Sequence, residues 1–509
     1  LKTIVNKVFE NTCNNSATPM SLFLALIAII FAGRLILKKY NPQAVLILTG
    51  LLLTVTAHLL GYIDVTTLVK KSTGLSAFDL FENIRDTFSS RAGGLGLQIM
   101  LIGAFAMYMS HIGASQVLVR VSSRPLQKLN SPYLLLGLAF ILGQFLSLFI
   151  SSAAGLGLLL MATLYPVLVG LGCSRAAVVA VIASTCCVEF GPASGNSNFA
   201  ADLLQIPVID YFVDTQIPVA VPLIIFVALI HVVVQRFFDS RIKDDAGDTL
   251  QLDEKAAEEI KSNAPVFYLL LPMLPLVLML IGSKIVSENY RITLDTAVLI
   301  SLSLCMFIEY LRLRNAQEVM KGLQTVFSGM GKIFATVVTL IVAGETFATG
   351  LKSIGAIDAL INMANSFGLS AAPIVLLMAL LTFLISALMG SGNAAFFSFA
   401  PMIPDIGRHI GGDISQMLMS VQMSSAFGRT ISPIAGVIIA VSGIAGLSPI
   451  DVVKRTFIPM VVGWLAMLTL SFARSGQLLS VLPYLGAIVV IIIIAVIMIR
   501  NMAGRTQQA

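Results

Sequence analysis

Long runs of apolar residues fill this sequence, and polar residues interrupt them at only a few places. In the first half the runs lie near residues 20–38, 43–62, 93–111, 176–205 and 217–237. Each run reaches roughly the 18 residues that a helix needs to cross a bilayer. Because their hydrophobicity is continuous, they differ from the short alternating strands of an outer-membrane barrel. The pattern predicts an all-α polytopic membrane protein.

The second half of the sequence repeats the first at an offset of roughly 240 residues, which is too long for a solenoid repeat. The stretch "VIDYFVDTQIP" at 208–218, for example, matches "PIDVVKRTFIP" at 449–459. A charged stretch between the halves is predicted to be a soluble linker. The chain therefore divides into a first repeat (1–238), a cytoplasmic linker (239–264), a second repeat (265–473) and an extra C-terminal helix and tail (474–509). The first 19 residues have no assignment.

Each repeat contains one segment that is predicted to enter and leave the membrane on the same side. These re-entrant hairpins span residues 132–172 and 372–410, and in each of them two apolar legs flank a polar tip. A broken helix follows each hairpin, at residues 176–205 and 414–445. The first repeat then crosses the membrane an odd number of times, so the second repeat starts from the opposite face. We expect an inverted repeat with about 11 transmembrane helices plus two re-entrant hairpins.

The distribution of basic residues sets the predicted orientation of this topology. The hairpin arrangement places a set of lysines and arginines on one side of the membrane, among them Lys38, Arg120, Arg175, Arg312, Lys454 and Arg500. The loops on the other side carry charges of both signs. Because basic loops face the cytoplasm, we expect the N-terminus outside the cell and the C-terminus inside.

Composition supports the membrane assignment and excludes other classes. The chain has 57% hydrophobic and 11% charged residues, whereas a soluble domain has about 25% charged residues. The net charge of +6 comes without basic patches interleaved with aromatic residues, so we expect no nucleic-acid partner. The five cysteines lack the spacing of a metal site, and we expect neither a metal nor a cofactor.

The polar hairpin tips are the first candidates for a ligand site. Irregular backbone at membrane depth is tolerated where it is buried in protein or lines a watery cavity. Glycines allow a ligand to approach the backbone closely, and the helix that starts after each tip points its free N–H groups at the site, which suits a carboxylate. The alternative is that small residues only serve helix packing. The candidates at the tips are Ser151, Ser152, Gly155, Ser391, Gly392 and Asn393.

The helix breaks supply the second set of candidates. They are "VEFGPASGNSN" at 188–198 and "SAFGRTISPIAG" at 425–436, and each contains a proline whose missing N–H frees a carbonyl. The candidates in the breaks are Ser194, Gly195, Asn196, Arg429, Thr430 and Ser432.

Arg429 is the strongest of these candidates because it is a cation within apolar sequence. Such a charge costs about 2.5–3.5 kcal/mol at the bilayer centre, and its planar fork can hold a carboxylate through two hydrogen bonds. The alternative is a salt bridge from Arg429 to Glu189 or Glu345. These two acids are also the candidate coupling residues, either as proton carriers or as structural partners. The histidines lie near the ends of spans, where interfacial packing is expected.

Four stretches carry a resemblance to a known family. They are "SSAAGLGLLLMATLYPVLV", "MGSGNAAFFSFAPMIP", "GRTISPIAGVIIAVSGIAGLSPIDVVKRTFIP" and "SRPLQKLNSPYLL", and they resemble the anaerobic four-carbon dicarboxylate carrier family (DcuC/DcuD type). The likeness covers nearly the whole chain after about residue 20. It implies a secondary active transporter of succinate, fumarate and malate, working by uptake, exchange or efflux in the bacterial inner membrane. The wider ion-transporter superfamily implies a homodimer and an elevator-type motion.

Several alternatives stay open at this point. The coupling ion is either a proton or sodium, and the substrate can instead be another organic anion, such as citrate, an acylated amino acid or a short-chain fatty acid. An intramembrane hydrolase is disfavoured, because no histidine or lysine accompanies Ser152 or Ser391 as a base. In an elevator, the spans near 43–62 and 292–311 would form the fixed scaffold. The amphipathic arms 115–130 and 356–369 would act as its hinges.

Overall fold

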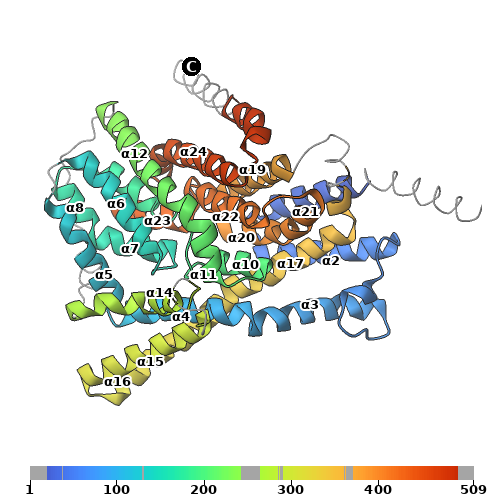
Figure 1. The fold of residues 1–509 in the computed structure, drawn as a ribbon, viewed down its shortest axis with the longest axis horizontal. Coiled ribbons are helices and arrows are strands. Elements are labelled where there is room, and N and C mark those ends of the chain that lie inside the picture. The colour runs from blue at the N-terminus through green and yellow to red at the C-terminus, as the bar shows by residue number, and fades with distance from the viewer. Residues whose placement is uncertain are drawn as a thin grey trace, which may run out of the picture.

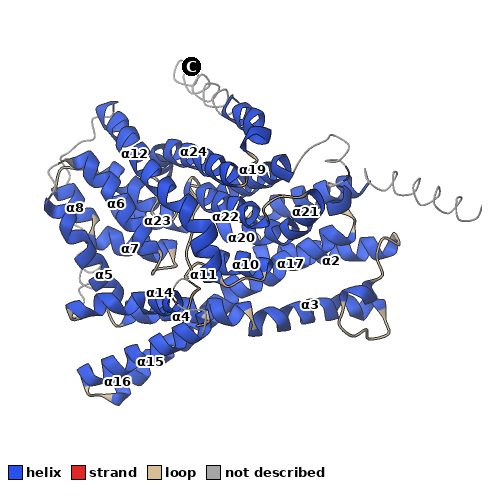
Figure 2. Cartoon of the chain, in the orientation of Figure 1, coloured by secondary structure: helices blue, strands red, loops and turns tan. Residues whose placement is uncertain are grey.

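The computed structural model describes residues 20–36, 38–128, 131–241, 264–284, 286, 291–359, 362 and 371–490. Within these ranges every regular element is a helix and no strand occurs (Figure 2), so the all-α prediction is confirmed for this part of the chain. The unassigned first 19 residues, most of the predicted linker, most of the second predicted hinge arm and the tail from 491 lie outside the described residues.

The first half consists of helices of very different lengths (Figure 1). They are a helix at Met20–Ile36, α2 (Pro42–Leu59), η1 (Val65–Leu68), α3 (Ser76–Gly93), α4 (Leu95–His111), α5 (Ala114–Ser123), η2 (Arg124–Lys128), α6 (Pro132–Ser147), α7 (Ala153–Thr163), α8 (Tyr165–Gly170), α9 (Arg175–Ala183), α10 (Gly195–Leu204), α11 (Val208–Asp210), η3 (Tyr211–Gln216) and α12 (Ile217–Arg241). The segment predicted as the first hairpin contains α6, α7 and α8. The first predicted broken helix contains α9 and α10.

The second half has a similar order of elements. They are η4 (Val266–Met273), α14 (Leu274–Ile281), α15 (Leu294–Leu313), α16 (Ala316–Ile333), η5 (Phe334–Val338), α17 (Thr339–Ser353), α19 (Ala371–Met389), α20 (Gly392–Phe399), η6 (Ala400–Met402), α21 (Ile403–Ile410), α22 (Ile414–Thr430), α23 (Gly436–Ala445) and α24 (Pro449–Arg474), followed by a helix at Leu478–Val490. In both halves a long apolar helix, a polar turn and shorter helices precede an interrupted helix and a long final helix.

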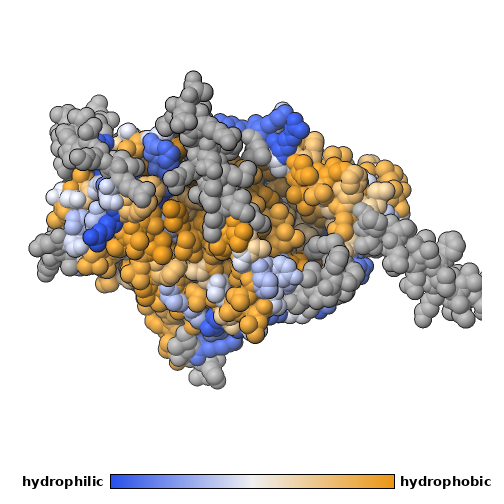
Figure 3. Space-filling model, turned by 90° about the horizontal axis from the view of Figure 1, so that it is seen from above, coloured by the Kyte–Doolittle hydropathy of each residue, from blue (hydrophilic) through white to orange (hydrophobic). Residues whose placement is uncertain are grey.

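Six of the described helices are long and apolar enough to cross a membrane, or seven if α3 and α4, which meet at 45°, count as one span. Other described apolar helices have only 10–17 residues. The number of about 11 spans and the inverted topology therefore stay predictions. Hydrophobic residues cover much of the face seen in Figure 3, with hydrophilic residues gathered toward its edges. This distribution suits a surface that meets lipid.

Helices α2 and α17 pack backbone against backbone. A Cβ atom added to Gly50 would lie 2.5 Å from the carbonyl oxygen of Thr346, and one added to Gly350 would lie 2.6 Å from the carbonyl oxygen of Gly50. Small residues allow such close approach between helices in a membrane. We call α2, α3 and α17 the frame, since α3 also packs on α17.

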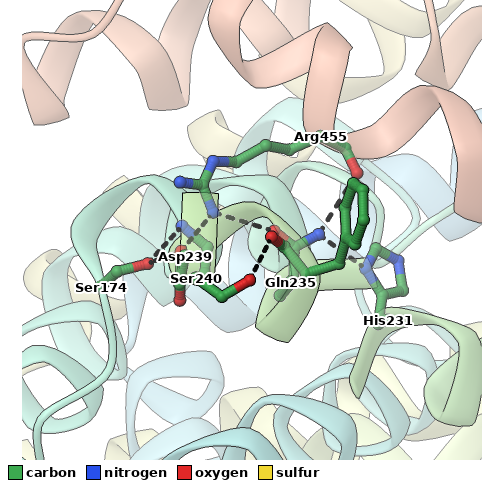
Figure 4. Close-up of polar contacts among 8 residues, drawn as sticks. Ser174, His231, Gln235, Asp239, Ser240 and Arg455 are labelled. Atoms are coloured by element: carbon green, nitrogen blue, oxygen red, sulfur yellow. Dashed lines mark hydrogen bonds and ion pairs between the residues drawn. The ribbon is translucent and has the colours of Figure 1, made fainter. Parts of the chain in front are cut away.

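A buried polar network joins α9, α12 and α24 (Figure 4). His231 on α12 is fully buried, and its Nε2 lies 3.0 Å from the hydroxyl of Ser184, just after α9. The Ser184 hydroxyl donates to the carbonyl of Val181, so His231 must donate through Nε2. The expectation that this histidine packs at the membrane interface is wrong, because the ring is buried inside the protein against Phe140 on α6 and Ser184.

The same network ties the other end of α9. Asp239 on α12 accepts a hydrogen bond from Ser174, the residue before α9, at 2.8 Å, and pairs with Arg455 on α24 at 2.6 Å. Gln235 links the two ends by donating to the carbonyl of Arg455 at 3.2 Å and to Nδ1 of His231 at 3.5 Å. Helix α9 is therefore fixed at both ends to the long helices that close the two halves.

Candidate functional site

One pocket brings together the first hairpin tip, the first helix break and the end of α22. It is lined by Ser147, Ile150, Ser151, Ala153, Cys186, Val188, Glu189, Phe190, Ser194 and Arg429. Three predicted ligand residues, Ser151, Ser194 and Arg429, thus surround one space together with the coupling candidate Glu189. Both halves of the chain contribute to it.

The guanidinium of Arg429 has hydrogen-bonding capacity to spare. Its Nη2 donates to the carbonyl of Cys186 at 3.1 Å, whereas its buried Nε has no partner in the described part of the chain. Neither Glu189 nor Glu345 forms an ion pair with it. The predicted alternative, a salt bridge from Arg429 to Glu189 or Glu345, is wrong, because Ser194 and Asn196 bind Glu189 and Glu345 pairs with Arg91. An unpartnered N–H on a cation in a pocket is costly and suits an anionic ligand.

Glu189 also faces this pocket, and neutral groups hold its carboxylate. Ser194 donates to its Oε1 at 2.7 Å and Asn196 donates to its Oε2 at 3.0 Å. Ser194 caps α10, because its hydroxyl accepts a hydrogen bond from the N–H of Ser197 at 3.2 Å. The pocket therefore contains one cation and one carboxylate that do not neutralise each other directly.

Asn196 links the first break to the tip of the second hairpin. Its side-chain nitrogen also donates to Oδ1 of Asn393 at 3.3 Å, while its own buried Oδ1 has no partner within the described residues. Asn393 lies in the first turn of α20, directly after the tip. The polar residues of the first break and of the second hairpin thus converge next to the pocket, as the mirrored arrangement predicts.

Comparison with known proteins identifies the family to which this geometry belongs. The model of the family described as C4-dicarboxylate anaerobic carrier matches residues 20–474. The chain belongs to this family. It is 38% identical over 446 residues to the anaerobic C4-dicarboxylate transporter DcuC of Escherichia coli K12, covering 88% of this chain and 95% of that one. A probable DcuC transporter of Vibrio cholerae is 34% identical over 445 residues, covering 87% and 95%.

Two solved structures share the fold of this C4-dicarboxylate carrier. The Neisseria gonorrhoeae protein MtrF, described with a class of antimetabolite efflux pumps, superimposes with a TM-score of 0.60 at 12% identity, over 85% of this chain and 94% of that one. The YdaH transporter of Alcanivorax borkumensis gives 0.55 at 16% identity, over 86% and 99%. The relatives are transporters and not enzymes, and the family together with the apolar helices implies a multi-pass protein of the inner membrane.

In this carrier, several predicted ligand residues cap helices or pack inside the protein and do not line the pocket. Ser152 caps α7 by accepting from the N–H of Gly155 at 3.1 Å, and both residues are exposed outside the pocket lining. Thr430 is buried and donates to the carbonyl of Ala426. Gly392 packs so closely on Ser425 that an added Cβ would lie 2.9 Å from its carbonyl oxygen. These residues shape the helix ends around the pocket without lining it.

The remaining candidates lie near helix starts or inside the protein. Gly195 opens α10, where an added Cβ would meet only Ile99 and Val337 at 3.5 Å or more. Ser391 precedes α20 and is half-buried, and its side chain makes no capping bond. Ser432 is fully buried, and its hydroxyl has no partner within the described residues. None of the three lines the pocket.

Two glutamines that sequence reasoning missed support the first break. Gln422 on α22 donates to the carbonyl of Glu189 at 3.1 Å and to the hydroxyl of Ser197 at 3.0 Å. Gln216 accepts from the N–H of Gly191 at 2.9 Å and donates to Gln422 at 3.2 Å. Both glutamines are fully buried. Their position inside apolar runs was the signal in the sequence that could have identified them, because a buried amide needs hydrogen-bond partners.

Proposed function

We propose that this chain is a secondary active transporter of four-carbon dicarboxylates, such as succinate, fumarate and malate, by uptake, exchange or efflux. The similarity of the chain to anaerobic C4-dicarboxylate transporters supports the substrate class. The observation that carries the proposal for the site is the unpartnered Nε of Arg429 in a pocket that also contains Ser151 and Ser194. Arg429 holds one substrate carboxylate there.

The second carboxylate of the substrate needs a separate positive end. The first turn of α10 begins next to Ser194, and α7 and α20 begin at the two hairpin tips. Helix N-termini attract anions in this way. The ligand set we propose is therefore Arg429 with the polar groups of Ser151, Ser194, Asn196 and Asn393, and it fits a dianion better than a monoanion.

Glu189 and Glu345 are the proposed coupling residues, and their positions suggest different roles. A dianion next to an ionised Glu189 is repelled, so a proton on Glu189 or a bound cation would accompany the substrate. Glu345 lies in an ion-paired cluster with Arg91 and does not line the pocket. A proton and sodium are both compatible with Glu189.

The larger-scale proposals concern motion, assembly and orientation. We propose an elevator, in which the body that carries the pocket moves against the frame, with the N-terminus outside the cell and the C-terminus in the cytoplasm. We also propose a homodimer. Helices α15 and α16 pack on α4 and expose large apolar side chains such as Phe307 and Phe327, which suits contact with lipid or a second copy.

Counterflow tests the function directly. Purified protein in liposomes loaded with unlabelled succinate should concentrate labelled external succinate, with and without sodium and across pH. Fumarate and malate should compete, whereas citrate, an acylated amino acid and butyrate should compete weakly. Strong competition by one of these other anions and none by fumarate would assign the carrier to a different substrate.

A further inference from the structure

A cluster outside the pocket joins three distant parts of the chain. Arg91, at the end of α3, lies between Glu345 on α17 and Asp202 on α10. The ion-pair distances are 2.5 Å to each carboxylate. All three side chains are largely buried, with exposed fractions of 22% for Arg91, 30% for Asp202 and 13% for Glu345. One guanidinium therefore serves two carboxylates, and the ionised cluster carries a net charge of −1.

Arg91 does not hold the two carboxylates equally. Its Nε and Nη2 both bind Glu345, at 2.8 Å and 2.5 Å, in a two-pronged contact. Asp202 receives only the single hydrogen bond from Nη1. Since paired hydrogen bonds between a guanidinium and a carboxylate are the stronger arrangement, Asp202 is the partner that can leave.

In the proposed elevator, the two carboxylates belong to different bodies. Arg91 and Glu345 belong to the frame, in which α2 and α17 pack backbone against backbone. Asp202 lies on α10, which hydrogen bonds attach to the pocket. The side chain of Asn198 donates to the carbonyls of Pro192 and Ser194, at 2.8 Å and 2.7 Å, and Ser197 receives a hydrogen bond from Gln422. Any movement of the pocket against the frame must pull Asp202 from Arg91.

Other titratable groups around α10 do not compensate Asp202. The elements packed on α10 are α4, α11, α20, α22 and η3. Their titratable residues are Tyr108, His111, Asp210, Tyr211, Asp214 and Arg429. Among the described residues, the ion pair of Asp202 is with Arg91, and the charged groups that interact with Glu345 are Arg91 and Asp202. A separated Asp202 would thus be a carboxylate without a counter-charge.

We propose that Asp202 is a proton-binding site that releases the pocket from the frame: it is ionised while Arg91 holds it and protonated when α10 moves away. The inference rests on the proposed elevator motion. Separation leaves Arg91 and Glu345 as a neutral pair, and a carboxylate that stays largely buried without a counter-charge is costly unless it takes up a proton. The site differs from Glu189, because it controls movement of the body and not the charge in the pocket.

Distances between spin labels test this without substrate. Labels at positions 90 and 206, which are exposed neighbours of Arg91 and Asp202, are attached in a cysteine-free background and measured in nanodiscs at pH 5.5 and pH 8. We expect one short distance to dominate at pH 8 and a longer one to grow severalfold at pH 5.5. Asp202→Asn should give the longer distance at both pH values. A pH response that persists unchanged in this variant, or a single distance in the unmodified protein, would overturn the proposal.

Two further variants make the assignment specific. Glu345→Gln leaves Arg91 with Asp202 as its sole charged partner, so the short distance should dominate at both pH values; loss of the short distance would contradict the proposed roles. Asp210→Asn is the matched control, because Asp210 pairs with Lys284 at 3.2 Å through a lysine that is 60% exposed, and it should keep the pH response. Succinate counterflow on the same proteins decides the transport function separately.

Discussion

Substitution of Arg429 by lysine gives the sharpest test of the binding site. In the structure Nη2 of Arg429 donates to the carbonyl of Cys186, and the buried Nε has no partner among the described residues. A lysine keeps the charge, but its ammonium group lacks the planar fork that holds a carboxylate through two parallel hydrogen bonds. We therefore expect Arg429→Lys to lose one charge-assisted hydrogen bond to the substrate.

The expected size of this loss follows from the hydrogen bond. Such a bond contributes about 1.5–3 kcal/mol, which corresponds to a roughly tenfold to hundredfold weaker affinity for succinate. Butyrate has the same chain length but a single carboxylate, so the start of α10 can still hold it and its affinity should fall much less. The ratio of the two affinities therefore separates substrate binding from general damage.

The assay measures both affinities by competition in counterflow, on protein that elutes as a single folded species. Arg175→Lys is the matched control. Arg175 is also half-buried and donates to the carbonyl of Ala445 at 2.7 Å, but it lies outside the pocket lining. This control should leave the affinity ratio unchanged. If Arg429→Lys also leaves the ratio unchanged and only lowers the melting temperature, Arg429 does not bind the substrate.

Three other predictions follow from the proposed topology, coupling and packing. Single cysteines at Ser152 and Ser391, in a cysteine-free background, should react with a membrane-impermeant thiol reagent from opposite faces; reaction of both from one face would refute the inverted repeat. Glu189→Gln should flatten the pH dependence of net transport and spare one-for-one exchange, because exchange requires no change in carrier protonation, and an unchanged pH profile would make Glu189 structural. Asp239→Asn should destabilise the protein by about 3–5 kcal/mol, because it removes the carboxylate that pairs with the buried guanidinium of Arg455. A melting temperature within a degree or two of that of the unmodified protein would show that the network in Figure 4 does not fix α9.

Local sequence alone determined the helices and the positions where they stop. Apolar runs give helices because every backbone group in lipid must be paired within its own segment. Turn and capping residues then end them, so the polar tips before α7 and α20 and the breaks before α10 and α23 fall inside the predicted segments. The same logic singled out Arg429, Ser151 and Ser194, which line one pocket. A cation or hydroxyl inside apolar sequence is visible without any knowledge of the fold.

Tertiary structure alone decided which polar groups meet. Glu345 pairs with Arg91, 254 positions away, and His231 is buried against Ser184, although its place in the sequence suggests an interface. Ser152 and Thr430 bond to their own helices, whereas Asn196 reaches Asn393 in the other half. The hydrophobic pattern predicts that a residue lies in a helix. The rotation and packing of each helix determine which neighbour its side chain faces. Partners far apart in sequence are set by that packing.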